Sequence, residues 1–374
     1  MLDLDNLVAI DKSSVELLKL GGSAGGKESS GAGLDPKDRM SLLAQRLATA
    51  RDPELAHEIV KGAASALSKA GDPKAQFNFR EALGLEAVVQ ISERPSLNIQ
   101  DGFVNPAAPG YKPFEFKLLQ MQDEIRDVIG AVGRISLPDG TLVGTAVHFA
   151  EGRVVTARHV LEEIATQKKN GRWSFTSPGK TTIDFVGEAD RKSEPGFKIV
   201  NVKFCGADRI NREIDFARLD LAVLEIAPIA HAPWPNTVDF DGDEDKVKPK
   251  SWVYTIGFPG RPIPWKIKTK PASGYEVAAV IAKVFDDDFE CKKFAPGRIR
   301  KSPGSLDEDK ANRWVVVHDC STLRGNSGSA VVEFATEGAR VVGLHFGGLA
   351  RSANWAHAFS ALKDQMQAHG AKYA

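Results

Sequence analysis

Three segments, far apart in the sequence, each place a reactive polar side chain beside an apolar run. They are residues 156–160 (TARHV) with His159, residues 220–224 (DLAVL) with Asp220, and residues 325–329 (GNSGS) with Ser327. A serine hydroxyl is a weak nucleophile at neutral pH and needs a base in hydrogen-bond contact to take its proton. Histidine suits that role because its pKa lies near neutral pH, and a buried carboxylate can orient the imidazole. The three residue types therefore indicate nucleophilic catalysis by a serine.

These segments resemble the signatures of trypsin-like serine peptidases: a T-A-x-H histidine box, a D-[ILV]-A-[ILV]-L strand and a G-[DN]-S-G-[GS] nucleophile loop. The order His, Asp, Ser is that of the chymotrypsin group and differs from the order in subtilisins and α/β-hydrolases. The resemblance covers about residues 128–362. It implies a His159–Asp220–Ser327 catalytic triad, an acyl-enzyme intermediate and hydrolysis of peptide bonds in protein or peptide substrates.

The resemblance also assigns the oxyanion hole and separates this chain from the secreted enzymes. The backbone N–H groups of Gly325 and Ser327 are expected to bind the developing oxyanion. Classical trypsins pair a newly cleaved N-terminal amine with an aspartate just before the nucleophile, but Asn326 stands there and cannot form that ion pair. Val160 replaces the half-cystine that follows the family's histidine. These features are similar to the bacterial branch that includes the glutamyl endopeptidases.

The expected specificity pocket consists of residues before the nucleophile and of a glycine-rich strand. The resemblance places four residues in it: Ser321, Thr322, His345 and Gly347. Residues 343–348 (GLHFGG) are similar to the pocket wall of glutamyl endopeptidases, where a histidine and a threonine contact a substrate carboxylate. No carboxylate lies at the expected pocket floor, which argues against cleavage after lysine or arginine. An acidic side chain before the cut bond and a small or medium apolar one both stay open.

Two further sets of residues compete with these assignments. Asp215 also lies in a D-x-A-x-L context, but Arg218 would put a charge on a strand that is apolar in the family, so Asp220 is favoured. Four other histidines are expected to be ordinary strand or loop residues: His148, His231, His318 and His357. No pair of histidines has metal-ligand spacing, so we expect no metal and no cofactor.

The chain has a different composition before and after about residue 128. Residues 1–34 are expected to be a flexible arm that ends in a Gly/Ser linker. Residues 35–93 contain three Asp-Pro pairs, at 35–36, 52–53 and 72–73, which are typical of helix starts and predict a small helical domain. Residues 94–127 are predicted to be a proline-rich connector followed by an amphipathic helix over about 114–129.

From residue 128 to 374 the chain is predicted to form the catalytic domain. Short β-type runs there are separated by glycine and proline. The runs are GAVGRISL (130–137), GTAVHFA (144–150), RVVTA (153–157), LDLAVLEI (219–226), SWVYTIGF (251–258), EVAAVIAKVF (276–285), RWVVVHDC (313–320), SAVVEF (329–334) and RVVGLHFGG (340–348). The charged stretches 241–250 and 286–310 are predicted to be solvated loops. The pattern predicts an all-β fold, and the resemblance implies two packed six-stranded antiparallel barrels of chymotrypsin type.

The charge and the cysteine content limit which classes of molecule the protein is expected to bind and in which cellular compartment it is expected to lie. Lysine plus arginine and aspartate plus glutamate number 49 each, so no global field attracts nucleic acid or an anionic membrane. The start of the chain lacks the basic and apolar regions of a secretory signal, and no run is long enough for a transmembrane span. Three widely spaced cysteines fit a reducing compartment. We therefore expect a cytoplasmic protein.

The leading hypothesis is a serine endopeptidase that is regulated by, or docked to a protein partner through, its N-terminal helical domain. The alternative for that domain is a purely stabilising role. The alternative for the whole chain is an inactive adaptor that keeps the barrel fold to bind peptides.

Overall fold

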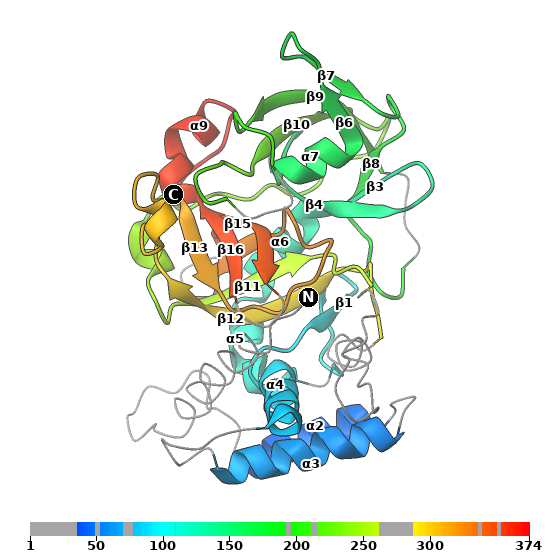
Figure 1. The fold of residues 1–374 in the computed structure, drawn as a ribbon. Helices are drawn as coiled ribbons and strands as arrows, with labels where there is room; N and C mark the ends of the chain where they lie inside the picture. The colour runs from blue at the N-terminus through cyan, green and yellow to red at the C-terminus, as the bar shows by residue number, and fades with distance from the viewer. Residues whose placement is uncertain are drawn as a thin grey trace.

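The computed structural model describes residues 36–48, 53–69, 78–108, 110–191, 196–210, 215–261, 287–335, 339–349 and 353–374. Figure 1 shows two packed β-structures, with the N-terminal helices forming a separate layer beside the β-structure that comes later in the chain. A short stretch of strands and helices connects the helical layer to the β-structures. The order along the chain is therefore helices, connector, first barrel and second barrel.

The first barrel is a closed antiparallel ring in the order β10-β5-β4-β3-β8-β9. Its strands are β3 (Val132–Ser136), β4 (Leu142–Ala150), β5 (Arg153–Thr156), β8 (Thr182–Asp184), β9 (Phe197–Cys205) and β10 (Ala222–Ile226). Helix α7 (Arg158–Ile164) follows β5 directly, and the small hairpin of β6 (Ala165–Gln167) and β7 (Trp173–Phe175) follows α7.

The second barrel is a ring in the order β11-β14-β15-β16-β13-β12, closed by pairing of β12 with β11. Its strands are β11 (Trp252–Gly257), β12 (Lys293–Lys301), β13 (Val315–His318), β14 (Ala330–Glu333), β15 (Val341–Leu349) and β16 (Ala353–Ala358). The remaining short helices in this half are η2 (Glu244–Val247), η3 (Asp307–Asp309), η4 (Phe359–Leu362) and α9 (Lys363–Gln367). The prediction of two six-stranded antiparallel barrels is confirmed.

Eight of the nine predicted β-runs coincide with strands, and the run 276–285 lies outside the described residues. The prediction of a solvated loop over 286–310 is wrong, because this charged stretch contains β12. β12 pairs with β11 on one side and with β13 and β1 on the other. Lys292 and Lys293 at its start are buried, which a charge-based interpretation could not foresee.

The helical layer contains α2 (Pro36–Leu47), α3 (Pro53–Lys69) and α4 (Phe79–Ser92). The first two begin at the prolines predicted as first helical positions, while the 72–73 signal lies outside the described residues. Helix α4 instead begins after Asn78, which forms a capping box with Glu81. The helices α3 and α4 cross where a Cβ on Gly62 would come within 2.3 Å of Arg80 O, so only glycine permits this approach.

The connector is more ordered than the sequence suggests. It contains β1 (Leu97–Gln100), β2 (Phe103–Val104), η1 (Lys112–Phe114), α5 (Glu115–Gln120) and α6 (Gln122–Ala131). The single helix predicted over 114–129 is thus divided into α5 and α6 at Met121. Strand β1 pairs with β12, with Leu97 opposite Phe294, so the connector extends the sheet of the second barrel.

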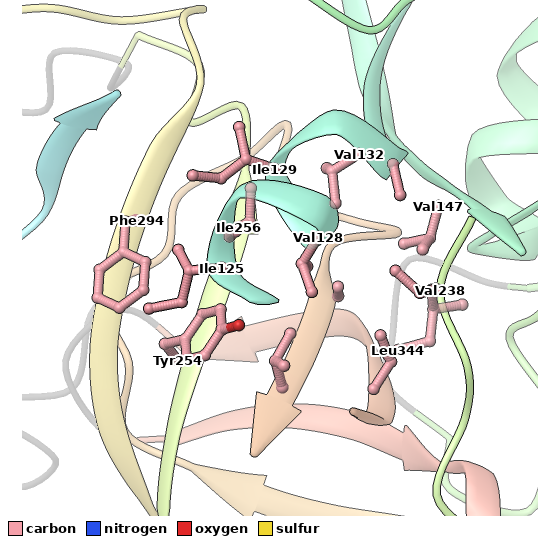
Figure 2. Close-up of a cluster of buried hydrophobic side chains, with 14 of the residues drawn as sticks. Ile125, Val128, Ile129, Val132, Val147, Val238, Tyr254, Ile256, Phe294 and Leu344 are labelled. Carbon is pink, nitrogen blue, oxygen red and sulfur yellow. The ribbon is translucent and has the colours of Figure 1, made fainter. Parts of the chain in front are cut away.

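Helix α6 lies between the barrels and contributes to a shared core (Figure 2). Its apolar side, with Ile125, Val128 and Ile129, is almost completely buried. The surrounding side chains come from both barrels: Val132 and Val147 from the first, and Tyr254, Ile256, Phe294 and Leu344 from the second. Because one apolar cluster spans the connector and both barrels, the connector fixes how the two barrels pack together.

Candidate active site

His159 and Asp220 are brought together by strand pairing in the first barrel. His159 is the second residue of α7, directly after β5, and Asp220 lies two residues before β10. β5 and β10 are antiparallel neighbours with Thr156 opposite Ala222. The end of one strand therefore meets the beginning of the other, and the two side chains lie at that edge.

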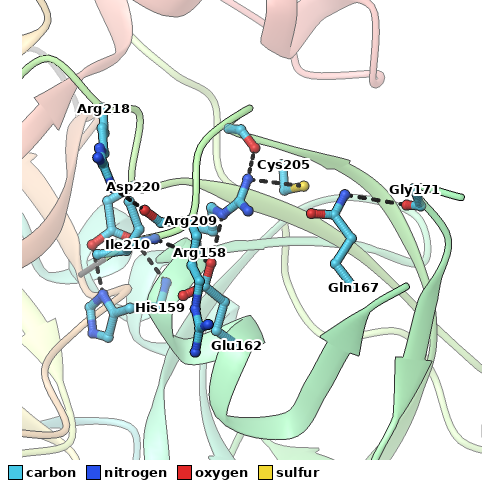
Figure 3. A network of polar contacts seen from close by, with 11 residues as sticks. Arg158, His159, Glu162, Gln167, Gly171, Cys205, Arg209, Ile210, Arg218 and Asp220 are labelled. Carbon is cyan, nitrogen blue, oxygen red and sulfur yellow. Dashed lines mark hydrogen bonds and ion pairs between the residues drawn. The ribbon is translucent and has the colours of Figure 1, made fainter. Parts of the chain in front are cut away.

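The Asp220 carboxylate binds His159 at two points (Figure 3). Its Oδ2 lies 2.7 Å from His159 Nδ1, and its Oδ1 accepts a hydrogen bond of 2.9 Å from the His159 backbone N–H. Asp220 is buried, while the His159 side chain keeps 29% of its surface exposed. This two-point contact fixes the ring and leaves its Nε2 edge for another partner.

The environment raises the pKa of His159 above its ordinary value. Burial by itself would lower the pKa, but the charge and hydrogen bond of Asp220, with smaller contributions from Glu163 and Glu162, outweigh it. The site therefore favours the imidazolium form, which is the form that a base reaches after taking a proton.

The competing aspartate lies elsewhere. Asp215 forms an ion pair of 2.9 Å with Arg218, and its side chain is 44% exposed. Its Oδ1 accepts from the N–H of Ala217, so it caps its own turn. The geometry thus associates Asp220 with His159 and leaves Asp215 at the surface.

Ser327 lies in the loop between β13 and β14 of the second barrel. Its carbonyl oxygen accepts a hydrogen bond of 2.8 Å from the N–H of Thr145 in β4 of the first barrel. A Cβ on Gly144 would lie 2.7 Å from Val160 Cγ2 and 3.1 Å from Ser327 O. The missing side chain of Gly144 thus lets the serine loop pack against the residue next to His159. In the described part of the chain Ser327 Oγ makes no hydrogen bond.

The backbone around Ser327 requires glycine. Gly325 and Gly328 have φ of +97° and +91°, and a Cβ on Gly325 would lie 2.5 Å from Phe258 O. The carbonyl of Gly325 is held by Thr145 Oγ1 at 2.8 Å. Among the described residues, the N–H groups of Gly325 and Ser327 donate to no protein acceptor. Both amides are thus free to donate to an oxyanion.

The pocket residues expected from the sequence are already engaged within the protein. Ser321 Oγ donates to Arg94 O at 2.6 Å, and Thr322 Oγ1 donates to Asn354 Oδ1 at 2.6 Å. Asn354 is itself oriented by a bond from its Nδ2 to Cys320 O. Each hydroxyl has one proton, so in this arrangement neither can donate it to a substrate. Their place in a substrate pocket stays a prediction.

His345 lies on β15 and contacts a second histidine. Its Nδ1 is 3.2 Å from Nε2 of His318, which ends β13, and both rings are buried. Burial lowers the pKa of His318 to about 3. Burial, with the charges of His318 and His159, holds the pKa of His345 well below its ordinary value. Both rings are therefore neutral at pH 7. Gly347, the fourth expected pocket residue, follows a β-bulge in this strand.

Two residues without an expected role at the site support the His159–Asp220 pair; one of them, His357, is predicted from the sequence only as an ordinary strand or loop residue. His357 Nε2 accepts a hydrogen bond of 2.9 Å from the N–H of Asp220, and burial lowers the pKa of His357 to about 4. Arg158, fully buried beside His159, pairs with Glu162 at 2.9 Å and donates to Gly206 O (Figure 3). The hydrogen bond to His357 holds Asp220 in place, and the contacts of Arg158 hold α7 against the end of β9. Neither residue has a local sequence pattern that could have revealed this.

Over the described residues, no group of three His, Cys, Asp or Glu side chains is arranged to hold a metal ion. The described helices also include none that is long and apolar enough to cross a bilayer.

Comparison with known proteins shows which protein family this chain resembles. The profile of the trypsin-like peptidase domain matches residues 144–344. A protein of Lysobacter enzymogenes named "Probable serine protease" is 29% identical over 315 residues, which cover 80% of this chain and 78% of that protein.

Solved structures of the Rv3671c protease of M. tuberculosis also match. Its inactive form gives a TM-score of 0.38 at 17% identity and covers 68% of this chain and 96% of that chain. Its active form gives 0.36 at 16% identity and covers 67% and 85%. At these TM-scores the likeness carries no argument about this chain.

Proposed function

This chain belongs to the family with a trypsin-like peptidase domain and is a serine protease, and from this premise we propose that His159, Asp220 and Ser327 form its catalytic triad. The observation that carries the proposal is the two-point contact between Asp220 and His159, through Nδ1 and the backbone N–H. A carboxylate in this position selects the tautomer with a free Nε2 lone pair, which a base for serine requires.

The proposed reaction proceeds through an acyl-enzyme. Ser327 Oγ attacks the carbonyl carbon of the peptide bond while His159 Nε2 takes its proton, and the N–H groups of Gly325 and Ser327 bind the oxyanion. His159 then gives the proton to the leaving amine, and the C–N bond breaks. Water, deprotonated by His159, attacks the ester and releases the acid, and the proton returns to Ser327.

A fluorophosphonate label separates this endopeptidase from an inactive adaptor with the same fold. The reagent phosphonylates a serine only where a base and an oxyanion hole activate it. We expect stoichiometric labelling of the folded full chain, and peptide mass mapping should place the adduct on Ser327. Protein that is denatured before the reagent is added serves as the control and should take up no label. Folded wild-type protein that takes up no label would favour the adaptor.

We further propose that the enzyme prefers an acidic side chain before the cut bond, with His345 as the donor. The support is the pairing of His345 with His318, whose Nδ1 is buried without a partner. A buried N–H without an acceptor is rarer than an unprotonated nitrogen without a donor, so the His318 proton is assigned to Nε2. His318 then donates to His345 Nδ1, and His345 keeps its own proton on Nε2 for a substrate oxygen.

A peptide library tests this preference. Cleavage after glutamate should exceed cleavage after leucine, and His345→Phe should lower the glutamate-to-leucine ratio of kcat/KM about 10- to 100-fold, because a hydrogen bond to a charged group is lost. A bound carboxylate favours protonation of the neutral His345, so the ratio should rise as pH falls. The leucine substrate is the internal control. Cleavage after lysine or arginine with none after glutamate would contradict the proposal.

The contacts of the buried Asp319 carboxylate support the exclusion of basic side chains before the cut bond. Its Oδ1 accepts from the N–H of Arg298 at 2.7 Å, and its Oδ2 lies 3.6 Å from Arg300. Both carboxylate oxygens thus face β12, and Oδ2 makes no hydrogen bond among the described residues. A small or medium apolar side chain before the cut bond is the second candidate, favoured because the hydroxyl protons of Ser321 and Thr322 are already engaged.

The compartment and the role of the helical domain are also proposals. A cytoplasmic location is supported by the three cysteines, Cys205, Cys291 and Cys320, which are all free thiols. Resemblance to bacterial enzymes and the relative from Lysobacter support a bacterial origin.

Regulation by the helical domain, or docking of a protein partner through it, is supported by the separate apolar core of this domain, which α2, α3 and α4 form.

A further inference from the structure

The segment that leads from β13 to Ser327 is held on two sides. On the barrel side, Asp319 N donates to Arg298 O at 3.1 Å, and Arg298 N donates to Asp319 Oδ1 at 2.7 Å. On the other side the partner is not a barrel strand but Arg94, at the end of the helical layer. The serine loop is therefore attached to the N-terminal part of the chain.

Arg94 makes two hydrogen bonds to this segment, in opposite directions. Its Nη1 donates to Asp319 O at 3.3 Å, and its carbonyl oxygen accepts from Ser321 Oγ at 2.6 Å. Arg94 and Ser321 are 8% and 6% exposed, so water competes little for either bond. The pair of contacts fixes both the position and the direction of residues 319–321.

Apolar packing extends the contact toward the nucleophile. Leu323 and Phe289, both from the second barrel, pack against the core of α2, α3 and α4. The carbonyl oxygen of Leu323 accepts from the N–H of Asn326, the residue before Ser327, at 3.0 Å. A shift of Leu323 would therefore reach the N–H groups of Gly325 and Ser327 through this turn.

Arg94 is itself fixed by two structures that meet at it. Its N–H donates to Val89 O at 3.1 Å, which completes the C-terminal turn of α4. Three residues later Leu97 pairs with Phe294 in β12. The position of Arg94 thus depends on α4 being folded and on β1 being seated on the second barrel.

We propose that Arg94 is a positioning residue for the serine loop, and that the helical domain acts as an internal activator of the peptidase and not as an inhibitor. This inference rests on the proposed function. Catalysis needs the Gly325 and Ser327 amides and Ser327 Oγ within a fraction of an ångström of their working positions. In this chain Asn326 cannot form an ion pair with an N-terminal amine, and the helical domain holds the preceding segment.

The test compares Arg94→Ala with Arg39→Ala in the full-length chain. Arg39 is the matched control, because it is also buried and pairs with Glu93 at 2.7 Å within the helical layer. Arg94→Ala should lower kcat and the rate of fluorophosphonate labelling by about 10- to 100-fold, since small misplacements of catalytic groups have effects of this size. Amide exchange in residues 319–327 should become faster. Arg94→Lys, which keeps a donor for Asp319 O, should recover part of the labelling rate, and Arg39→Ala should keep the wild-type rate.

Thermal unfolding establishes that each variant is folded at the assay temperature. If Arg94→Ala does not fold, Leu323→Ala replaces it with the same expected loss. Labelling of a folded Arg94→Ala variant at the wild-type rate, or faster, would overturn the inference. Failure of the proposed function is distinguishable, because the wild-type protein itself would then take up no label.

Discussion

Replacing Ser327 with alanine is expected to lower kcat by about 10⁶-fold, because nucleophile and base act as one unit in such enzymes. The side chain makes no hydrogen bond among the described residues, so its loss should not unfold the protein. The measurement is single-turnover peptide cleavage at saturating substrate, with circular dichroism as the control for folding.

His159→Ala is expected to cause a loss of similar size, and the double variant should lose little more than either single variant. Without the base, Ser327 Oγ keeps its proton and cannot attack, so the second change removes nothing that still functions. Losses that multiply in the double variant would show that the two residues act independently. Wild-type turnover by Ser327→Ala would show that another residue is the nucleophile.

Asp220→Asn is expected to lower kcat by about 10⁴-fold, which corresponds to about 5 kcal/mol of transition-state stabilisation. The amide keeps the size of the side chain and can still accept from the His159 N–H. Its NH₂ group, however, would donate to Nδ1 and place the imidazole proton on Nε2, where the base must be free. The serine proton then has no acceptor.

The pH dependence separates this effect from a simple change of charge. Asp220 raises the pKa of His159, so its removal should move the acid limb of the kcat/KM profile to lower pH. At pH 7 more of the histidine would then be neutral, yet activity should fall. The loss therefore cannot come from protonation of the base.

Asp215→Asn is the matched control for this variant. It changes the competing aspartate, which pairs with Arg218 at the surface. We expect its kcat to stay close to wild type, since exposed ion pairs contribute little. A large loss in Asp215→Asn with normal activity in Asp220→Asn would reverse the assignment of the acid.

Much of the first barrel and of the candidate site could be predicted because the signals are local. The runs that became β5, β10 and β14 are rich in β-branched and small residues, and each overlaps or adjoins one of the three motifs. The glycines around Ser327 likewise indicated a tight turn, and Gly325 and Gly328 have the positive φ that only glycine adopts readily.

β12 and β1 could not be predicted, because their stability comes from distant partners. β12 reads KFAPGRIRK, a charged sequence with a central proline. Its place in the barrel depends on pairing with both β11 and β13, and Lys292 just before it is accommodated by bonds to Ile129 O and Phe185 O. β1 has four residues and pairs locally with β2, but it gains its second partner, β12, only when the second barrel is present.

The sequence by itself therefore determined the residue types of the candidate site, their order His159, Asp220, Ser327, and the strands beside them. It could do so because a motif and the apolar residues that flank it occupy a few neighbouring positions. The tertiary structure alone decided which groups hold those residues. His357 reaches Asp220 across 137 residues, and Arg94 reaches Asp319 across 225. Such contacts leave no periodic trace in either segment, because each depends on the relative placement of elements that only the packed core establishes.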